Sequence, residues 1–285
     1  MLYVEVCATS ANLCIGFDVL GLALDLKNRF TFEESNDFSF KGFDEPYNQK
    51  ENNLVYHAYS IVFEQAKRKL IPVEIGFEGA VPIARGLGSS ATLIVAGMLA
   101  ANALLNNIFS IEELLQIGTS IEGHPDNIAP ALYGGFIASY YDSKKYYSIR
   151  YPVSSNLKFF VVIPSYEVST EQARGVLPRM LEYVDIVSNL SRIVHLPKAL
   201  ADGDLKLLKN LFQDKLHEPY RKAFIKEYDK VRRVCEEEGL ALAISGSGST
   251  LLVIADNEQA IMKLQFKDCK TMLLPIGNKA RVWKE

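Results

Sequence analysis

The sequence lacks the features that mark several protein classes. Its four cysteines, Cys7, Cys14, Cys235 and Cys269, are scattered and form no CxxC pair, so four reduced and mostly packed thiols are expected instead of a disulfide framework. No basic segment followed by an apolar one opens the chain, so no signal peptide is apparent. No apolar run is long enough to span a bilayer. These absences predict a cytoplasmic protein without a membrane partner.

Charge of either sign is also not in excess. The chain carries 31 Lys and Arg against 34 Asp and Glu, a net charge of −3, which gives no reason to expect nucleic acid as a partner. Neither an HExxH motif nor a Cys/His ligand pattern supports a zinc site. With 285 residues, 48% of them hydrophobic, the chain has ample material for a core and suits two domains of ordinary size.

The most informative stretch that is present covers residues 81–105, VPIARGLGSSATLIVAGMLAANALL. Pro82 stops the preceding extended run, and two glycines, Gly86 and Gly88, let the backbone turn tightly and approach a ligand. Ser89 and Ser90 then open a helix whose unpaired N–H groups and dipole favour a bound phosphate. Because this helix is apolar almost all round, it must be buried. The stretch therefore predicts a phosphate-binding loop on a rigid support.

Three interpretations compete for this loop. It can be a plain glycine turn before a core helix, or a Rossmann fingerprint, since it fits G-x-G-x-x-A. The fingerprint requires a strand running straight into the turn and an acidic residue that closes the next strand about 20 residues on. Pro82 interrupts the strand, and the next acids lie in a helix start, where Ser110 and Glu113 form a capping box. No Walker A motif occurs. In the third interpretation, P-x-x-x-G-L-G-S-S-A resembles the phosphate loop of the GHMP small-molecule kinases.

The rest of the chain mixes strand and helix patterns in both halves, which indicates an α+β fold. Strands are expected at residues 2–8, 29–35, 37–43, 73–79, 132–142, 146–152, 156–164, 240–244, 250–256 and 271–276. Helices are expected at residues 54–70, 91–105, 111–123, 180–200, 204–212, 217–239 and 259–266, and residues 165–178 form a polar turn entering a helix. Residues 122–131 place Glu, His, Asp and Asn between prolines, a pattern typical of neither a simple surface loop nor a helix.

Three glycine-containing stretches in this order resemble the three motifs of the GHMP kinases: SANLCIGFDVLGLAL, PIARGLGSSATLIVAG and AISGSGSTLLVI. Within that superfamily, EGHPDNIAPALYGGF, VSTEQAR and EPYR resemble the homoserine kinase family. The resemblance spans about residues 6–254. It implies a two-domain fold, with a domain like domain 2 of ribosomal protein S5 at residues 1–153, a ferredoxin-like domain at 154–285 and the site between them. The implied reaction is the ATP-dependent, Mg²⁺-assisted phosphorylation of the L-homoserine side-chain hydroxyl, on the way to threonine.

The resemblance also implies a role for individual positions. Homoserine binding is expected at Asn12, Asp18, His124, Arg174 and Arg221, catalysis at Asn127, Thr170 and Arg174, and magnesium at Ser90 and Glu122. ATP binding is expected at Asn53, Pro82, Ile83, Ala84, Arg85, Gly86, Leu87, Gly88, Ser89, Ser90, Ala91, Thr92, Gly246 and Gly248. The chemistry agrees with these expectations, because homoserine is a zwitterion. Asp18 can take the ammonium group while the two arginines hold the carboxylate in a fork geometry.

The sequence departs from the family pattern at a few positions. Cys14-Ile15 replaces the frequent Gly-Pro, Thr92 an alanine and Ser249 a proline, and the Leu-x-Pro-Gly that usually follows Arg221 is missing. Several relatives carry an aspartate where this chain has Asn127. A neutral amide accepts no proton at pH 7, so either no base is needed or Asp126 or His124 serves as the base. Rival functions are another GHMP kinase, acting on mevalonate or a sugar, and a non-catalytic S5-like module. A homodimer is considered as the assembly.

Overall fold

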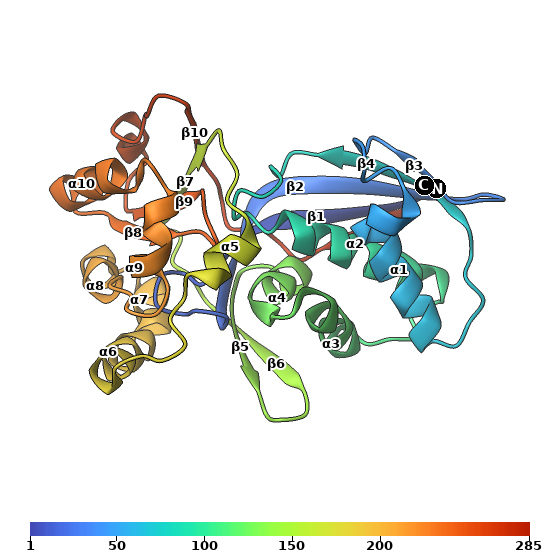
Figure 1. Ribbon diagram of the computed structural model, residues 1–285, viewed down its shortest axis with the longest axis horizontal. Helices are drawn as coiled ribbons and strands as arrows, with labels where there is room; N and C mark the ends of the chain where they lie inside the picture. Colours follow the sequence, from blue (N-terminus) through green and yellow to red (C-terminus); the bar gives the residue numbers. More distant parts are fainter.

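The computed structural model describes the backbone of residues 1–285 and the side chains of residues 1–260 and 262–285, and the chain forms two lobes (Figure 1). The first lobe is built on a seven-stranded sheet of β1 (Leu2–Ala11), β2 (Leu20–Glu34), β3 (Ser39–Lys41), β4 (Val73–Gly79), β5 (Phe136–Tyr141), β6 (Tyr146–Tyr151) and β11 (Arg281–Lys284). The strands run in the order β11-β1-β2-β4-β3, and β5 joins β2 to β6. All the pairs are antiparallel except β3 with β4.

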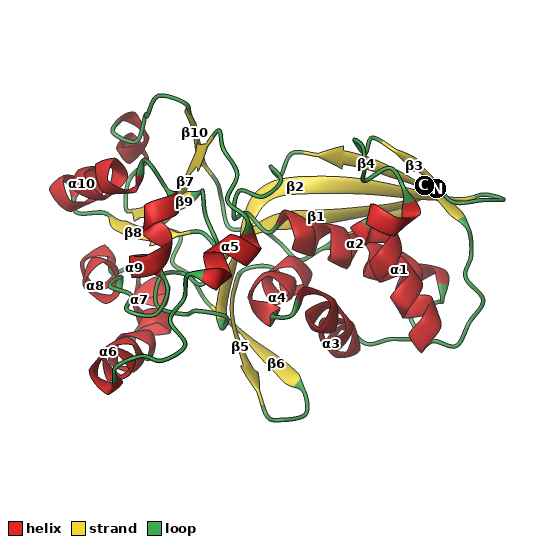
Figure 2. Ribbon diagram, viewed as in Figure 1, coloured by secondary structure: helices red, strands yellow, loops and turns green.

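Four helices cover one face of this sheet (Figure 2). They are α1 (Leu54–Gln65), α2 (Ser89–Leu104), α3 (Ile111–Glu122) and α4 (Pro125–Tyr133), and a short 3₁₀ turn, η1 (Lys50–Asn52), precedes α1. As its composition predicts, α2 is buried, and its side chains join those of the sheet and of α1 in one core. The predicted capping box of α3 is confirmed, since Ser110 and Glu113 exchange both hydrogen bonds.

The second lobe has a four-stranded antiparallel sheet of β7 (Lys158–Pro164), β8 (Ala241–Ile244), β9 (Leu251–Ala255) and β10 (Cys269–Leu273), in the order β10-β7-β9-β8. Its helices are α5 (Thr170–Gly175), α6 (Tyr183–Ile193), α7 (Leu196–Asp202), α8 (Leu205–Leu211), α9 (Glu218–Arg221) and α10 (Tyr228–Glu238), with 3₁₀ turns η2 (Lys222–Phe224) and η3 (Glu258–Met262). Helical segments separate β7 from β8 and β9 from β10, the succession of a ferredoxin-like unit. The predicted α+β fold is thus confirmed.

One expectation was wrong at residues 122–131, where α4 forms despite two prolines. Pro125 occupies the first turn, where its missing N–H is not needed. Pro130 lies inside the helix and leaves the Asp126 carbonyl without its helical donor. That carbonyl instead approaches Gly21 of β2 so closely that a Cβ there would lie 1.9 Å from it. The glycine in β2 leaves room for this carbonyl and so lets α4 pack closely against the strand.

Three other helices are shorter than the sequence predicts. Residues 180–200 divide into α6 and α7, because Pro197 lies in the first turn of α7. Residues 217–239 divide into α9, η2 and α10, with the buried Ile225 in an extended conformation between them. Only a 3₁₀ turn forms at residues 258–262. Apolar residues at helical spacing continue across these breaks, so the sequence pattern did not indicate where the helices end.

The strand β11 was not predicted at all. It pairs with β1 of the first sheet, so the chain returns to the first lobe after completing the second. The predicted division into domains between residues 153 and 154 stays a prediction. The strand β11 lies in the second of these ranges but pairs in the first sheet. Among the helices that the structure describes, none has the length and apolar character needed to cross a membrane.

Candidate active site between the lobes

A cavity lies where the two lobes meet, and most of the predicted site residues line it. Those present are Asn12, Asp18, Ala84, Arg85, Gly86, Gly88, Ser89, Ser90, Glu122, His124, Asn127, Thr170, Arg174, Arg221 and Gly246. They come from the β1–β2 turn, the loop before α2, the α3–α4 junction, α5, α9 and the turn between β8 and β9. Segments up to 234 residues apart in sequence therefore meet in one cavity, as the hydrogen bond from Asn12 Nδ2 to the Gly246 carbonyl oxygen shows (3.0 Å).

The loop before α2 has the geometry of an anion site. Gly86 and Gly88 both have positive φ, +75° and +66°, a conformation that side chains rarely adopt. Gly88 is the N-cap of α2 and, having no side chain, cannot cap the helix with one. The first N–H groups of a buried 16-residue helix are thus directed at the cavity, where an anion would complete their hydrogen bonds.

The turn between β8 and β9 packs directly on this loop. Ser245 Oγ donates to the Gly86 carbonyl oxygen (2.6 Å), and the Thr250 N–H donates to the Arg85 carbonyl oxygen (3.0 Å). A Cβ on Gly86 would lie 2.1 Å from the backbone carbonyl oxygen of Ser245, so glycine is required there for close contact. The expected packing of the Gly246–Gly248 turn beside the phosphate loop is observed, and it joins the two lobes.

Arg85 fastens the loop to the second lobe from the other side. Its guanidinium donates to the carbonyl oxygens of Pro164 (3.2 Å) and Ser165 (2.8 Å) at the end of β7, and it lies 3.2 Å from the Glu167 carboxylate. With these partners engaged, the positive charge of Arg85 is directed toward β7. Arg85 therefore holds the loop against the second lobe.

Two oxygen ligands stand together at the start of α2. Ser90 Oγ donates to Glu122 Oε2 over 2.7 Å, and both side chains are only partly buried. A carboxylate and a hydroxyl beside an anion site form a donor set that suits a hard divalent cation bridging phosphates. These two residues therefore fit a magnesium ion.

Asp18 and Arg174 form a two-point ion pair across the cavity. Arg174 donates through Nη2 to Asp18 Oδ1 (2.6 Å) and through Nη1 to Oδ2 (3.1 Å). The hydrogen bonds to Asp18 raise the pKa of Arg174 further above its ordinary value. Asp18 has a φ of +58° in the β1–β2 turn, and Asn12 Oδ1 accepts its N–H (3.1 Å). The turn therefore presents this carboxylate to α5.

Arg221 is buried deeper than Arg174, at 2% exposure. Its Nε donates to the Ala173 carbonyl oxygen and its Nη1 to that of Gly246, each over 3.0 Å. Burial and the charge of Arg174 lower its pKa to about 10, which still leaves it charged at neutral pH. Both guanidinium groups lie over the ring of Phe17, 5.5 Å for Arg174 and 5.0 Å for Arg221, so the aromatic face holds the two cations in the same corner.

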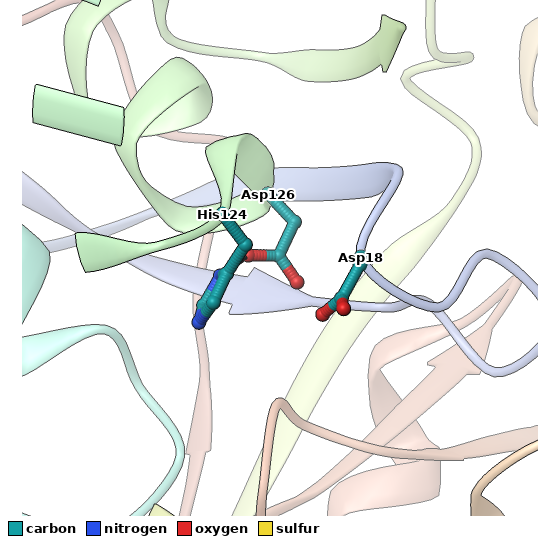
Figure 3. A group of neighbouring side chains, drawn as sticks. All are labelled: Asp18, His124 and Asp126. Atoms are coloured by element: carbon teal, nitrogen blue, oxygen red, sulfur yellow. Dashed lines mark hydrogen bonds and ion pairs between the residues drawn. The ribbon is translucent and has the colours of Figure 1, made fainter. Parts of the chain in front are cut away.

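A second carboxylate, Asp126, faces Asp18 from the first turn of α4 (Figure 3). Asp126 Oδ1 pairs with His124 Nδ1. Burial lowers the pKa of His124, but the hydrogen bond and charge of Asp126 outweigh it, so the pKa lies above its ordinary value. Ligand atoms of Asp18, His124 and Asp126 lie within 4.8 Å of one another. Arg174 already pairs with Asp18 and His124 with Asp126, so each of these two carboxylates has a partner within the protein.

Asn127 lies next to this cluster, and its amide has a fixed orientation. Thr9 Oγ1 of β1 donates to Asn127 Oδ1 (2.7 Å), while Asn127 Nδ2 points at Asp126 Oδ1 at 3.5 Å. Across the cavity, the hydroxyl oxygens of Thr170 and Ser247 are 3.4 Å apart. The carbonyl of Asn127 is thus engaged behind the cavity, and its NH₂ group is the part that remains for a ligand.

Seven predicted positions do not line the cavity. They are Asn53, Pro82, Ile83, Leu87, Ala91, Thr92 and Gly248. Asn53 caps α1 by accepting the Tyr56 N–H (2.9 Å) and donates to the Tyr47 carbonyl oxygen (2.7 Å). Thr92, one of the departures, accepts a hydrogen bond from Asn28 Nδ2 (2.8 Å) and donates to the Ser89 carbonyl oxygen (2.7 Å). Its hydroxyl therefore ties the start of α2 to β2.

Sequence reasoning gave no site role to several residues that the structure places here. Ala11 and Ser247 line the cavity, while Thr9 and Phe17 act on residues that do. His217 stacks on Phe17 at 5.2 Å and bonds the Cys14 carbonyl oxygen (2.6 Å). Thr9 directly precedes the first glycine-containing motif and Phe17 lies within it, so the motif could have indicated both. Nothing local marks His217, which lies 200 residues from its partner Phe17.

Both lobes of the chain are similar to those of known kinases. The model of the GHMP kinases N terminal domain matches residues 53–135, and that of the GHMP kinases C terminal domain matches residues 197–267. A homoserine kinase of Clostridium acetobutylicum is 42% identical over 93% of this chain and 92% of its own, and one of Clostridium beijerinckii is 40% identical over 94% and 91%. A crystal structure of homoserine kinase from Cytophaga hutchinsonii superposes with a TM-score of 0.88, at 28% identity, over 99% of this chain and 97% of its own.

Proposed function

The chain belongs to the GHMP kinase family, and on that premise we propose that it phosphorylates the side-chain hydroxyl of L-homoserine, converting ATP to ADP and giving O-phospho-L-homoserine for threonine biosynthesis. The observation that carries this choice of substrate is the pairing of Asp18 with Arg174 next to the buried Arg221. A carboxylate, that of Asp18, beside the two guanidinium groups of Arg174 and Arg221 matches a zwitterionic amino acid.

The two ends of homoserine replace the partners that the side chains have in the free protein. The ammonium group takes the place of Arg174 beside Asp18, and the carboxylate takes the place of Asp18 beside Arg174. Arg221, held at the Gly246 carbonyl oxygen, adds a second positive charge for the carboxylate. Mevalonate has a carboxylate but no ammonium group, so it would leave Asp18 without a cation. This difference favours homoserine over the other alcohols that the family phosphorylates.

ATP binds with its phosphates at the start of α2. The free N–H groups after Gly88 hold phosphate oxygens, and Arg85 keeps the loop closed against β7. Ser90 and Glu122 hold Mg²⁺, which supplies neutralisation of the phosphate charge when bound. Asn53, Leu87 and Gly248 support the nucleotide site from behind, because they fix the helix starts and turns that form it.

Catalysis rests on alignment. Asn127 and Thr170 both line the cavity, and we assign the Asn127 NH₂ group and the Thr170 hydroxyl to the reacting hydroxyl of the substrate. The Thr9 bond holds the Asn127 amide in the donor orientation, which suits the oxygen of a substrate hydroxyl. No side-chain base is required, since the transition state of phosphoryl transfer is loose and the proton can leave late. Orientation and charge stabilisation then supply the rate.

A coupled ADP-release assay with homoserine, mevalonate, serine and galactose tests the proposal. Homoserine should give by far the highest kcat/KM, and activity should depend on Mg²⁺. Serine has the same charged groups but one carbon less, so its hydroxyl cannot reach the phosphate. Preference for mevalonate or galactose would assign the chain to another branch of the family, and no ADP release with any of the four would favour a non-catalytic role. We place the reaction in the cytoplasm, where the four free cysteines stay reduced.

A further inference from the structure

His217 is a fully buried histidine to which the proposed mechanism gives no role. It does not line the cavity, but each of its ring nitrogens faces a segment that does. Nε2 lies 2.6 Å from the carbonyl oxygen of Cys14, in the β1–β2 turn that presents Asp18. Nδ1 lies 3.5 Å from Nη1 of Arg221 in α9. The ring therefore connects the two segments that are assigned to opposite ends of homoserine.

These two partners define the protonation state of the ring. A carbonyl oxygen can only accept a hydrogen bond, so Nε2 carries the hydrogen that it donates to Cys14. A guanidinium group can only donate, so Nδ1 has no hydrogen where it faces Arg221. Only the neutral ring with its hydrogen on Nε2 meets both conditions. A second hydrogen, on Nδ1, would place two donors and two positive charges against each other.

The carboxylate of Asp214 lies near the ring without requiring it to be charged. Its Oδ2 is 3.7 Å from Nε2 of His217, farther away than the Cys14 oxygen. Its two oxygens already accept four N–H groups, those of the Asn189 side chain (2.7 Å) and of the Leu216 (3.1 Å), His217 (2.7 Å) and Glu218 (2.8 Å) backbone. These donors stabilise the negative charge of Asp214 without a second proton on the ring.

Three charged side chains act on the ring: Asp214, Arg221 and Asp18. Burial lowers the pKa of His217, Asp214 and more weakly Asp18 raise it, and Arg221 lowers it. The net direction is downward, which keeps the ring neutral at neutral pH. The buried Cys14 thiol and Glu218 carboxyl group add no negative charge there, since burial raises the pKa of both.

The bond to Cys14 fixes a segment that local preferences do not stabilise. Asn12, Leu13 and Cys14 have φ values of +71°, +40° and +65°, in the left-handed region that residues with a side chain rarely adopt. Three such residues in succession persist only where their surroundings hold them. His217 donates to the last of the three, and Asp18 follows in the same turn. The position of the Asp18 carboxylate thus depends on the ring.

The other side of the ring limits where Arg221 can lie. Its guanidinium group donates to the carbonyl oxygens of Ala173 and Gly246, and Nδ1 of His217 is a third acceptor, beside Nη1. Phe17 stacks on the His217 ring at 5.2 Å and lies 5.0 Å from the centre of the guanidinium group. A displaced ring would therefore move both an acceptor of Arg221 and the aromatic face beneath it.

We propose that His217, as a neutral imidazole, is a positioning residue that sets the distance between Asp18 and Arg221 in the homoserine pocket. Because these two groups are assigned to the ammonium and carboxylate ends of homoserine, this role rests on the proposed function. His217 acts only through its partners, since it does not line the cavity itself. A substrate with both charged ends depends on both contacts of the ring, whereas an alcohol with one charged end depends on one of them.

Three substitutions at His217 separate the two contacts. His217→Phe keeps a ring that can stack on Phe17 but removes both hydrogen bonds. His217→Gln has an amide that reaches as far as Nε2, so it retains the donor for Cys14 and loses the acceptor for Arg221. His217→Asn reaches only as far as Nδ1, so it retains the acceptor and loses the donor. His195→Phe, the same change at an exposed histidine of the second lobe, is the matched control.

Kinetics with two substrates measure the contacts one at a time. His217→Phe should raise KM for homoserine by about tenfold or more, the effect of a lost buried hydrogen bond, and leave KM for ATP close to that of the parent. An alcohol with an ammonium group and no carboxylate, 3-amino-1-propanol, needs Asp18 but not Arg221. With this alcohol His217→Gln should match the parent, whereas His217→Asn should raise KM severalfold. With homoserine, both amide variants should lie between the parent and His217→Phe.

The state of the ring can be measured without any substrate. In NMR spectra of protein that carries isotope-labelled histidine, the shifts of the two ring nitrogens distinguish both neutral tautomers from the charged ring. The chain has 4 histidines, so the signals of His217 are those missing in His217→Gln. They should show a hydrogen on Nε2 and stay unchanged from about pH 5.5 to about pH 7.5, a range in which an ordinary histidine titrates.

Inactivity of the parent on homoserine would overturn both the proposed function and this role of His217. With an active parent, unchanged kinetics in His217→Phe would overturn the role alone, and so would a charged ring or a hydrogen on Nδ1. Equal rises in KM for homoserine, 3-amino-1-propanol and ATP would also overturn it, because they would show a structural effect without register. Circular dichroism checks the fold of each variant. If His217→Phe does not fold, the two amide variants and the spectra of the parent decide.

Discussion

Thr9 and Asn127, 118 residues apart in sequence, share a buried hydrogen bond in which the Thr9 hydroxyl donates to the amide oxygen of Asn127 over 2.7 Å. The backbone N–H of Thr9 also donates to the Leu87 carbonyl oxygen in the phosphate loop (3.1 Å). One residue of β1 therefore touches both the loop expected to bind phosphate and the amide expected to orient the substrate hydroxyl. The bond selects the donor side of Asn127 for the cavity.

Replacing Thr9 with valine tests this orientation. The substitution keeps the shape and removes the hydroxyl, so the Asn127 amide loses its buried donor and is free to rotate. We expect kcat to fall by about tenfold, the effect of a buried hydrogen bond worth 1–3 kcal/mol, while KM for ATP stays close to that of the parent. Thr9→Ser should retain activity. In an Asn127→Ala background, Thr9→Val should have no further effect on kcat. A full additional loss there would show that Thr9 acts through the phosphate loop instead.

Glu122 is expected to act through magnesium. Glu122→Gln keeps an oxygen that can accept from Ser90 but removes the negative charge, so the fold should persist and kcat should fall by about 100-fold or more. In a titration of Mg²⁺ at saturating substrate, the variant should need a higher Mg²⁺ concentration than the parent for half-maximal activity. Glu112→Gln, an exposed acid on the same helix, is the control. Turnover equal to that of the parent would remove Glu122 from the metal site.

Arg174→Leu should lower kcat/KM for homoserine, because the substrate carboxylate loses its partner. The loss should correspond to about 2–5 kcal/mol of activation free energy. The matched probe is 3-amino-1-propanol, which has the ammonium and hydroxyl groups of homoserine but no carboxylate. For this alcohol the loss should be much smaller, since Asp18 is then free to hold the ammonium group without displacing Arg174. Equal losses for the two substrates would mean that Arg174 serves ATP or the fold.

Glu218 should make stability depend on pH. Burial raises the pKa of its carboxyl group to about 8 from an ordinary value of 4.5, although the Ile244 N–H donates to it (2.6 Å). Since the folded protein holds the proton more tightly than the unfolded chain, this contribution is fully present below pH 4.5. It is lost as the pH rises to about 8, at up to about 1.4 kcal/mol per pH unit.

Glu218→Gln has no proton to lose at this position, so its free energy of unfolding should fall less steeply between these pH values. Denaturant unfolding of the parent and the variant, measured across the range, checks the difference. Glu237→Gln, on the exposed side of α10, should follow the parent. Parallel curves for the parent and Glu218→Gln would show that this carboxyl group does not titrate in the folded protein.

Local rules of backbone chemistry predicted part of the fold and of the candidate site. The Ser110–Glu113 capping box, the turn at Gly86 and Gly88 and the burial of α2 each depend on a few neighbouring residues, so the sequence contains them. The helix α4 could not be predicted in this way, because Pro130 is tolerated only through Gly21, more than 100 residues away. The same holds for β11, whose short exposed sequence becomes a strand only beside β1.

The candidate site, too, could be predicted only where it depends on local sequence. Motif resemblance located the residues that meet in the cavity, but not how they are paired before a substrate arrives. Asp18 and Arg174 were each assigned to one end of homoserine, and no spacing rule indicates that residues 156 positions apart bind each other. The orientation of Asn127 likewise depends on Thr9, whose hydroxyl carries no signal of its own in a strand.

The pairing of β1 with β11 also sets an order of events during synthesis. Residues 2–5 of β1 pair with residues 281–284, which are synthesised last. The sheet of the first lobe therefore gains its edge strand only after the second lobe has been translated. Until then β1 presents an unpaired backbone edge on the nascent chain, where it is open to association with other chains. A contact of such long sequence separation also forms slowly. Chaperones that shield nascent chains should therefore raise the yield of this protein more than its ordinary size suggests.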